Sequence, residues 1–211
     1  MKTILTAGFS CLVIFLLIKC VNPASQTTEV GTLPCLGNKI YTEDGDTLCH
    51  TIPDFKFVNQ DSQFVTNETF ENRAYVVDFF FINCPTICPK VTKQMLRLHN
   101  HYQDDDRILL MAHSIDPKRD SVSRLAHYAK NLGVTSEKWH FVTGEKDDIY
   151  EIADDYFSVA MEDDEAPGGF NHSGRLILID KDLHVRAFCD GTDSVSVTRF
   201  IGDIKLLLNE M

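Results

Sequence analysis

The chain has 211 residues, of which 44% are hydrophobic and 24% charged, a composition typical of a globular protein with one main domain and an N-terminal extension. Its formal net charge of −11 argues against nucleic acid as a partner, because phosphate binding requires clustered Lys and Arg. The same charge is compatible with a soluble surface, and also with a cationic partner or a metal ion.

The N-terminal segment, MKTILTAGFSCLVIFLLIKC, has an early Lys followed by an apolar run from Ile4 to Ile18. A run of about 15 residues has the length of the hydrophobic part of a signal peptide and is short for a membrane span. Cys20 follows this run and is a candidate for lipidation, although Lys19 stands where a small residue is expected, so an uncleaved anchor is the alternative. We therefore expect residues 1–20 to be a signal or anchor segment. The folded part is expected outside the cytoplasm, in the periplasm, tethered to the membrane through this segment only.

Residues 21–50 are polar and contain Pro and Gly, which predicts a linker and N-terminal extension ahead of a domain at 51–211. From residue 51 onward, strand and helix patterns alternate. The predicted elements, in chain order, are a strand–turn–strand unit around 59–62, a strand at 74–82, a helix at 90–102, a strand at 107–115, a helix at 121–133, a short strand at 139–144, a helix at 146–157, a strand hairpin at 175–191 with its turn at 180–182, and a helix at 194–211.

This order predicts an α/β fold with a central mixed sheet, parallel early and antiparallel late, and helices on both faces. The strand at 74–82, AYVVDFFFI, is apolar almost throughout and is expected to be the buried central strand. Asp78 interrupts it, and a buried carboxylate is costly without a partner. Asp78 could either tune the pKa of a nearby thiol or bond to a neighbouring backbone group.

The stretch FFFINCPTICPKVTKQM carries Cys84 and Cys88, each followed by a proline. It lies at the C-terminal end of the predicted central strand, where open α/β sheets place their sites. The next helix begins there, and its positive end stabilises thiolates. Two thiolates on the same side of a helical turn favour Cu(I) over hard cations.

A third metal ligand would have to come from elsewhere in the chain, and His172 is the strongest candidate among eight histidines. It lies in EDDEAPGGFNHSG, a predicted loop in which Gly168 and Gly169 could act as a hinge. A closed zinc site would need a fourth ligand, for which no residue is evident. The other histidines are interpreted as structural, with a metal-binding role for His50, next to Cys49, as a minor alternative.

Three blocks, VVDFFFINCPTICP, SIDPKRDS and FNHSGRLILID, resemble in order and separation the SCO/SenC family of thioredoxin-like proteins. The resemblance extends roughly from Thr51 to the C-terminus, and IPDFKFVNQD is similar to the opening hairpin of the family. It implies a thioredoxin-like fold with an N-terminal β-hairpin extension. It also implies copper as the cofactor, in the first place Cu(I) and alternatively Cu(II), held by Cys84, Cys88 and His172. Asn171 stands where the family often has Asp, which affects none of these ligands.

The resemblance further implies a metallochaperone or assembly factor that delivers copper to cytochrome c oxidase. The partner would be the copper-bearing subunit of that enzyme or another copper protein. The alternative is an enzyme, a thiol-disulfide oxidoreductase that cycles Cys84 and Cys88, even one that reduces the cysteines of the copper acceptor. Dedicated oxidoreductases of the thioredoxin type place two residues between their cysteines, whereas this chain has three. A peroxidase is a weaker third reading, and enzymatic activity is left open.

The seven cysteines are Cys11, Cys20, Cys35, Cys49, Cys84, Cys88 and Cys189. Cys35, Cys49 and Cys189 lie outside the copper motif, and an oxidising compartment predicts a structural disulfide between two of them. Their spacing does not identify the pair. We favour Cys49 with Cys189, because both lie beside predicted strands and Cys35 lies in the linker.

Overall fold

The structure is a computed structural model that describes residues 31–37, 40–41 and 47–211. The compact unit that contains the fold runs from Thr32 to Met211. The segment at 1–20, including Cys20, lies outside the described residues, as does most of the stretch at 21–50. Within the part of the chain that is described, none of the helices combines the length and apolar character needed to cross a bilayer.

The elements follow one another largely as the sequence predicts. The strands are β1 (Ile40–Tyr41), β2 (Thr47–Leu48), β3 (Lys56–Asn59), β4 (Phe64–Thr66), β5 (Ala74–Phe80), β6 (Ile108–Ser114), β7 (Trp139–Thr143), β8 (Ala160–Glu162), β9 (Phe170–His172), β10 (Arg175–Ile179) and β11 (Val185–Asp190). The helices are the short 3-10 helix η1 (Asn67–Phe70) and the α-helices α1 (Cys88–Tyr102), α2 (Val122–Leu132), α3 (Lys146–Asp155) and α4 (Ser194–Glu210).

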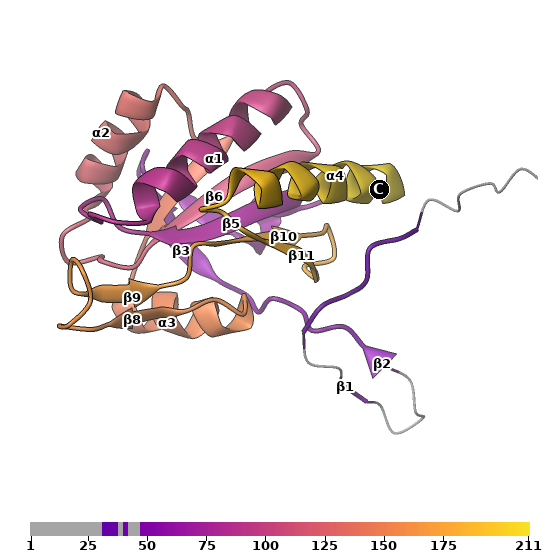
Figure 1. Cartoon of the computed structure of the whole chain (residues 1–211), viewed down its shortest axis with the longest axis horizontal. Coiled ribbons are helices and arrows are strands. Elements are labelled where there is room, and N and C mark those ends of the chain that lie inside the picture. Colours follow the sequence, from indigo (N-terminus) through magenta and orange to yellow (C-terminus); the bar gives the residue numbers. More distant parts are fainter. Residues whose placement is uncertain (1–30, 38–39, 42–46) are drawn as a thin grey trace, which may run out of the picture. The chain divides into compact units, whose positions relative to one another are not determined.

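Seven strands form the main sheet, in the order β11-β10-β5-β6-β7-β3-β4. Of these, β3, β5, β6, β10 and β11 are labelled in Figure 1. β5, β6 and β7 are parallel to one another, whereas β10 is antiparallel to β5 and β3 is antiparallel to β7. The late hairpin β10–β11 and the opening hairpin β3–β4 are both antiparallel. The predicted mixed sheet, parallel early and antiparallel late, is therefore confirmed, as is the opening hairpin.

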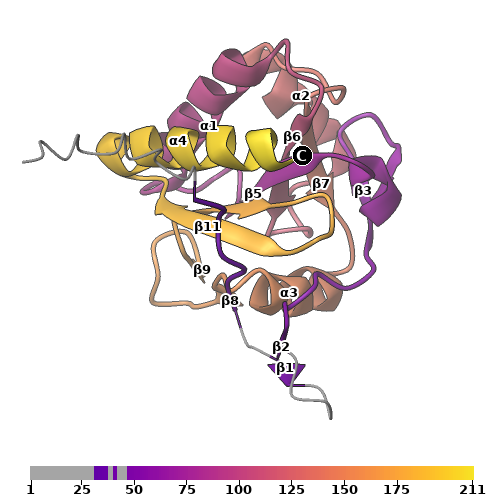
Figure 2. The same ribbon diagram turned by 90° about the vertical axis from the view of Figure 1, so that its right-hand side faces the viewer.

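Helices cover both faces of this sheet. Figures 1 and 2 show α1, α2 and α4 on one face, and α3 with the short β8–β9 ribbon on the other. In α1, Val91, Met95, Leu98 and Tyr102 are buried, the apolar positions that recur at helical spacing. α2 ends at Gly133, whose left-handed backbone provides the predicted C-terminal cap.

β5 is an interior strand of the sheet, between β10 and β6, and every one of its residues is buried. Its Val77 pairs with Met111 of β6 on one side and with Ile177 of β10 on the other. The strand ends at Phe80, shortly before Cys84. Because β5 and β6 are parallel, their carboxyl ends lie at the same edge of the sheet, and the cysteine motif begins at that edge.

Part of the stretch read as a linker is attached to the domain. The backbone N–H of Leu36 donates to the Val185 carbonyl at 2.7 Å, and that of Ile52 donates to the Leu183 carbonyl at 2.9 Å. The backbone at Leu36 and at Ile52 is therefore bonded to the first residue of β11 and to the turn just before it.

Candidate metal centre

The turn between β5 and α1 holds Cys84 in place. The Cys84 N–H donates to the Phe81 carbonyl at 3.1 Å, which closes the turn. The Ile82 N–H donates to Oδ2 of Asp120 at 3.0 Å, and the same oxygen accepts from Ser114 Oγ at 2.8 Å. Asp120 therefore fixes the backbone just before Cys84. Sequence reasoning did not single out this residue, although it lies in the SIDPKRDS block.

Cys88 is the first residue of α1, and Pro89 follows it in the first turn, where a missing N–H is tolerated. Cys84 and Cys88 are both buried free thiols. The helix thus begins directly at the second cysteine, as the motif suggested.

His172 comes from the opposite direction, on β9. The predicted open loop is instead a two-stranded ribbon in which β8 pairs with β9. Phe170 of β9 packs on Phe81 with ring centroids 4.9 Å apart. Gly168 has a φ of +88°, and a Cβ there would lie 2.8 Å from the Phe81 ring and 3.2 Å from Pro85. The glycine therefore allows the ribbon to approach the cysteine turn closely, besides its role in the turn.

These contacts bring the three predicted ligands together. His172 Nε2 lies 3.3 Å from Cys88 Sγ and 3.7 Å from Cys84 Sγ. The ligand atoms of all three residues lie within 4.8 Å of one another. On its other side, the ring has Nδ1 3.3 Å from the Ser173 carbonyl. With a proton on Nδ1 donated there, the Nε2 lone pair would be free for a metal ion, whereas in the metal-free protein Nε2 carries a proton when it donates to the Cys84 sulfur.

The two thiols differ in their acidity. Burial acts to raise the pKa of Cys84, but hydrogen bonds from the Cys88 backbone and from His172 outweigh it and lower that pKa to about 6. For Cys88, burial raises the pKa above its usual range, and the neighbouring Cys84 raises it further. At neutral pH the pair therefore carries one thiolate, and a bound cation would be needed to ionise the second sulfur.

Asp78 lies on β5, the strand that leads into the cysteine turn. Burial raises its pKa to about 7, and its charge in turn contributes to raising the pKa of Cys88. Its Oδ1 is buried without a hydrogen-bond partner. Of the two roles considered for Asp78, tuning of the thiols is the one that the structure favours.

The predicted disulfide between Cys49 and Cys189 is wrong: Cys49 is bonded to Cys35, with their Cα atoms 5.8 Å apart. Cys189 is a free, buried thiol on β11. The segments that carry Cys35 and Cys49 are bonded to the first residues of β11, at Val185 and just before it. Cys189 is four residues further on, roughly 13 Å along an extended strand, which is beyond the reach of a disulfide.

Three other histidines, His50, His113 and His140, have structural surroundings. His113 is fully buried, and burial lowers its pKa to about 3. Burial likewise lowers the pKa of His140 to about 4. The ring of His50 contacts the Asp155 carbonyl through Nε2 at 2.9 Å, so its nitrogen on that side is already engaged.

The cysteines are reached from outside through a groove. Its volume is about 410 Å³, and its lining is mainly apolar. The residues that line it are Phe81, Ile82, Cys84, Cys88, Pro89, Thr92, Lys93, Leu96, Tyr128 and Leu132. The two buried sulfurs therefore lie at the wall of an open depression.

Comparison with known proteins identifies a family and solved structures that are similar to this chain. The family model described as SCO1/SenC matches residues 44–209. This range contains all three residues of the candidate metal centre and almost every element of the main fold.

Three solved structures are similar over most of the chain. A SCO1/SenC family lipoprotein from Bacillus anthracis is 25% identical, with a TM-score of 0.68 over 75% of this chain and 95% of that one. BsSco, in which a disulfide switch was identified and which belongs to the Sco family of cytochrome c oxidase assembly proteins, is 27% identical, with a TM-score of 0.66 over 75% and 93%. Copper-bound ScoI from Arabidopsis thaliana is 20% identical, with a TM-score of 0.63 over 75% and 98%, and shows the shared fold.

Proposed function

The chain belongs to the SCO1/SenC family, and from this premise we propose that it binds copper through Cys84, Cys88 and His172 and passes the ion to another copper protein. The copper-bearing subunit of cytochrome c oxidase is the proposed acceptor. The observation that carries the proposal is the convergence of two sulfurs and one imidazole nitrogen within 4.8 Å.

The chemistry of these donors favours Cu(I). Thiolates are soft ligands that select Cu(I), and imidazole is also a good copper ligand. The charge of a bound cation would lower the pKa of Cys88, which burial otherwise raises, and so would make the second thiolate available. Cu(II), which also accepts imidazole and thiolate, is the second oxidation state proposed for this site.

Delivery requires that the ion can leave as well as bind. Three protein donors leave a further coordination position free for a ligand of the acceptor. The groove beside the cysteines gives such a ligand a route to the sulfurs, and its apolar lining suits contact with a protein. His172 belongs to a two-stranded ribbon that is separate from the main sheet, so a shift of this ribbon would loosen one of the three donors without breaking a strand pair of that sheet.

A second candidate function is thiol-disulfide exchange by Cys84 and Cys88. The observation in its favour is the unequal acidity of the pair, because a thiolate next to a protonated thiol is the arrangement of exchange catalysts. The disulfide switch of BsSco is also consistent with this chemistry. The imidazole held against both sulfurs is explained better by metal binding than by exchange.

We further propose that the domain acts outside the cytoplasm, in the periplasm, held at the membrane by the N-terminal segment. The related protein from Bacillus anthracis is a lipoprotein, which supports a lipid on Cys20 as one form of attachment. An N-terminal anchor that is retained without cleavage is the other form of attachment. The proposed domain division is a signal or anchor segment at 1–20, an extension at 21–50 and the SCO domain at 51–211.

Copper transfer tests the proposal directly. The chain would be loaded with one equivalent of Cu(I) without oxygen and mixed with a metal-free copper-binding domain of cytochrome c oxidase. After separation of the two proteins, copper is expected on the acceptor. Copper that stays on the chain at equilibrium would reject the carrier role, while retention of the ion in the loading step would still support a copper site.

A further inference from the structure

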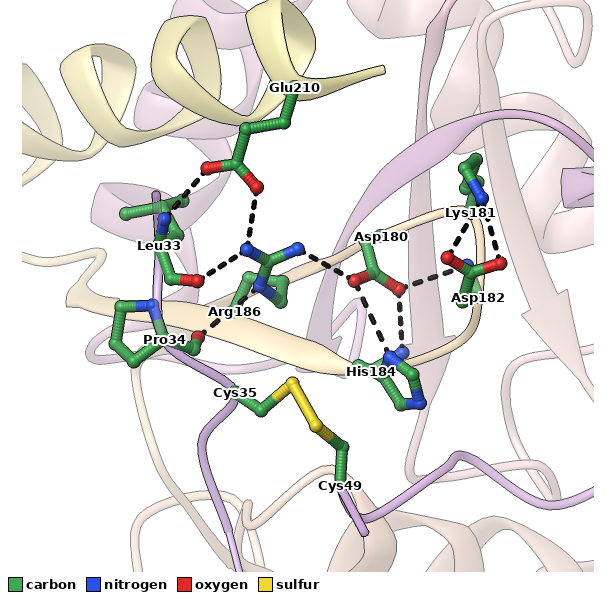
Figure 3. Close-up of polar contacts among 10 residues, drawn as sticks. All are labelled: Leu33, Pro34, Cys35, Cys49, Asp180, Lys181, Asp182, His184, Arg186 and Glu210. Atoms are coloured by element: carbon green, nitrogen blue, oxygen red, sulfur yellow. Dashed lines mark hydrogen bonds and ion pairs between the residues drawn. A yellow bond between two sulfur atoms is a disulfide. The ribbon is translucent and has the colours of Figure 1, made fainter. Parts of the chain in front are cut away.

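Figure 3 shows a second group of two sulfurs and one imidazole, formed by Cys35, Cys49 and His184. Cys35 and Cys49 form the disulfide, and the metal-ligating atoms of Cys35, Cys49 and His184 lie within 4.8 Å of one another. Ile179, at the end of β10, pairs with Tyr75 near the start of β5. His184 follows β10, so this group lies at the edge of the sheet where β5 begins. The candidate metal centre lies at the opposite edge, where β5 ends.

We propose that reduction of the Cys35–Cys49 disulfide converts this group into a second metal site, at which both cysteines and His184 bind a thiophilic d10 ion. Cu(I) and Zn(II) are the ions of this class that accept two thiolates and an imidazole. Three protein donors satisfy Cu(I), whereas Zn(II) would add a water. In the disulfide neither sulfur is a thiolate, so the site would exist only in the reduced protein. This proposal is independent of the function proposed for Cys84 and Cys88.

The reaction that opens the site balances with a dithiol as reductant. The S–S bond between Cys35 and Cys49 breaks and accepts two electrons and two protons, which yields two thiols. The dithiol loses the same two electrons and two protons and becomes a disulfide. Metal binding then releases the protons of the two thiols, because the thiolate is the form that coordinates.

The segment that carries Cys35 is held by contacts other than the disulfide. The Arg186 side chain donates to the carbonyls of Leu33 and Pro34, the two residues before Cys35 (Figure 3). Glu210 of α4 accepts from the Leu33 N–H at 2.7 Å and from Arg186 at 2.7 Å. Arg186 and Glu210 together therefore fasten this segment to β11 and α4.

Backbone bonds then place both cysteine segments on either side of His184. The Leu36 N–H donates to the Val185 carbonyl, and the Ile52 N–H donates to the Leu183 carbonyl. Between them, Thr51 forms an antiparallel bridge with His184 itself. Since none of these bonds involves sulfur, we expect both thiols to stay beside His184 after reduction.

His184 has the surroundings of a metal-binding histidine. Its Nδ1 lies 3.6 Å from Oδ2 of Asp180, and its backbone N–H donates to Oδ1 of the same residue at 2.9 Å. The same Oδ2 accepts from Arg186 at 2.8 Å, so Asp180 joins His184 to β11 and holds the residue beside the cysteine segments. The side chain of His184 is 26% exposed, and neither Cys35 nor Cys49 is buried, so a reductant and an ion can reach the group.

The test uses the full chain in a non-ionic detergent with Cys84→Ala and Cys88→Ala, which removes the first site. One half of the preparation is kept oxidised, and the other is reduced with a phosphine that is then removed without oxygen. Thiol counting confirms the state of each half. Cu(I) and Zn(II) are then titrated separately against a chromophoric chelator for each ion. One ion per chain is expected in the reduced half and none in the oxidised half, and the two titrations identify the ion.

Three matched variants complete the test in the same background. Cys35→Ser with Cys49→Ser should abolish binding, His184→Ala should weaken it about tenfold or more, and Cys189→Ser should leave it unchanged. Equal binding by the oxidised and reduced halves, or binding that survives Cys35→Ser with Cys49→Ser, would overturn the proposal. So would loss of the native circular dichroism spectrum on reduction, because the reduced site would then not exist in the folded protein.

Discussion

His172 Nε2 lies 3.3 Å from Cys88 Sγ, although 84 residues separate them in the sequence. Cys88 opens α1, and His172 closes a ribbon that packs on Phe81 from the other side. The imidazole therefore meets the thiols through tertiary packing, and each partner can be altered without removing the other. Substitutions at Cys84, Cys88 and His172 can therefore test the role of each residue separately.

Cys84→Ala and Cys88→Ala should each abolish stoichiometric binding of Cu(I), because one thiolate and one imidazole hold the ion poorly. Copper per chain would be measured after equilibration with a competing chelator, with the reduced protein kept free of oxygen. Cys189→Ala is the matched control, since Cys189 is also a buried free thiol but lies outside the site. Full affinity in either of the first two variants would show that the site has been assigned wrongly.

The reactivity of Cys84 should follow its lowered pKa. The hydrogen bonds that lower the pKa of Cys84 to about 6 stabilise its thiolate, so alkylation of metal-free protein should rise with pH around that value. Cu(I) affinity should fall with falling pH across the neutral range, because binding displaces the proton of Cys88, and it should fall more steeply below about 6, where protons also compete for Cys84. Peptide mapping would assign the alkylated residue. A titration centred near 9, the ordinary value for a thiol, would contradict the proposed hydrogen bonding.

Gly168→Ala should disturb the approach of His172, and Gly169 offers a matched control. Both glycines have a positive φ, so alanine is strained at either position. Only at Gly168 would the new Cβ meet Phe81 and Pro85, whereas at Gly169 it has open space. Gly168→Ala is therefore expected to reduce copper affinity severalfold more than Gly169→Ala, with both measured by competition. Equal losses would mean that ribbon packing does not position His172.

Asp120 should act as a positioning residue for Cys84. Asp120→Ala leaves the Ile82 N–H and the Ser114 hydroxyl without their acceptor, which should cost about 1–3 kcal/mol of folding free energy. Asp120→Asn keeps one side-chain oxygen and should restore most of this loss. Denaturant unfolding measures the free energy of unfolding. The alkylation rate of Cys84 shows whether the turn still holds this thiol in its native surroundings. An unchanged alkylation rate in folded Asp120→Ala protein would limit Asp120 to a role in stability.

The central fold and the cysteine pair follow from local patterns. The apolar strand at 74–80 and the amphipathic helix α1 can each be predicted from a short stretch of sequence. The cysteine motif lies where the strand leads into the helix. The β8–β9 ribbon cannot be predicted in this way, because residues 160–172 are rich in acidic residues and glycine and lack the alternation of apolar and polar residues that is typical of a strand. Phe170 holds it by packing on Phe81, a contact between distant parts of the chain.

The disulfide was mispredicted for a similar reason. Cys35 lies in a polar stretch with neighbouring Pro and Gly, which reads as a linker. Its position is set by Arg186 and Glu210, which both bind the backbone of Leu33. These two residues follow Leu33 by 153 and 177 positions in the sequence. No local pattern in the sequence reports such contacts.

The variant His172→Ala separates the two candidate functions of the cysteine pair. If His172 completes a copper site, the variant should lose copper affinity strongly, while thiol-disulfide exchange by Cys84 and Cys88 changes little. The reason is that the imidazole supplies one of three donors to the ion, whereas exchange needs only the two sulfurs. Both quantities would be measured on one preparation, with a chelator for Cu(I) and a dithiol substrate for exchange.

The opposite result has an equally definite meaning. His172 also helps to lower the pKa of Cys84, so an enzyme that depends on this thiolate should lose exchange rate in the variant. Slower exchange with unchanged copper affinity would therefore favour the oxidoreductase. We expect the copper result, because the Cys88 backbone N–H contributes more than His172 to the lowered pKa of Cys84 and remains in the variant. No such substitute exists for the metal: among the described residues, the cluster at this site contains only Cys84, Cys88 and His172.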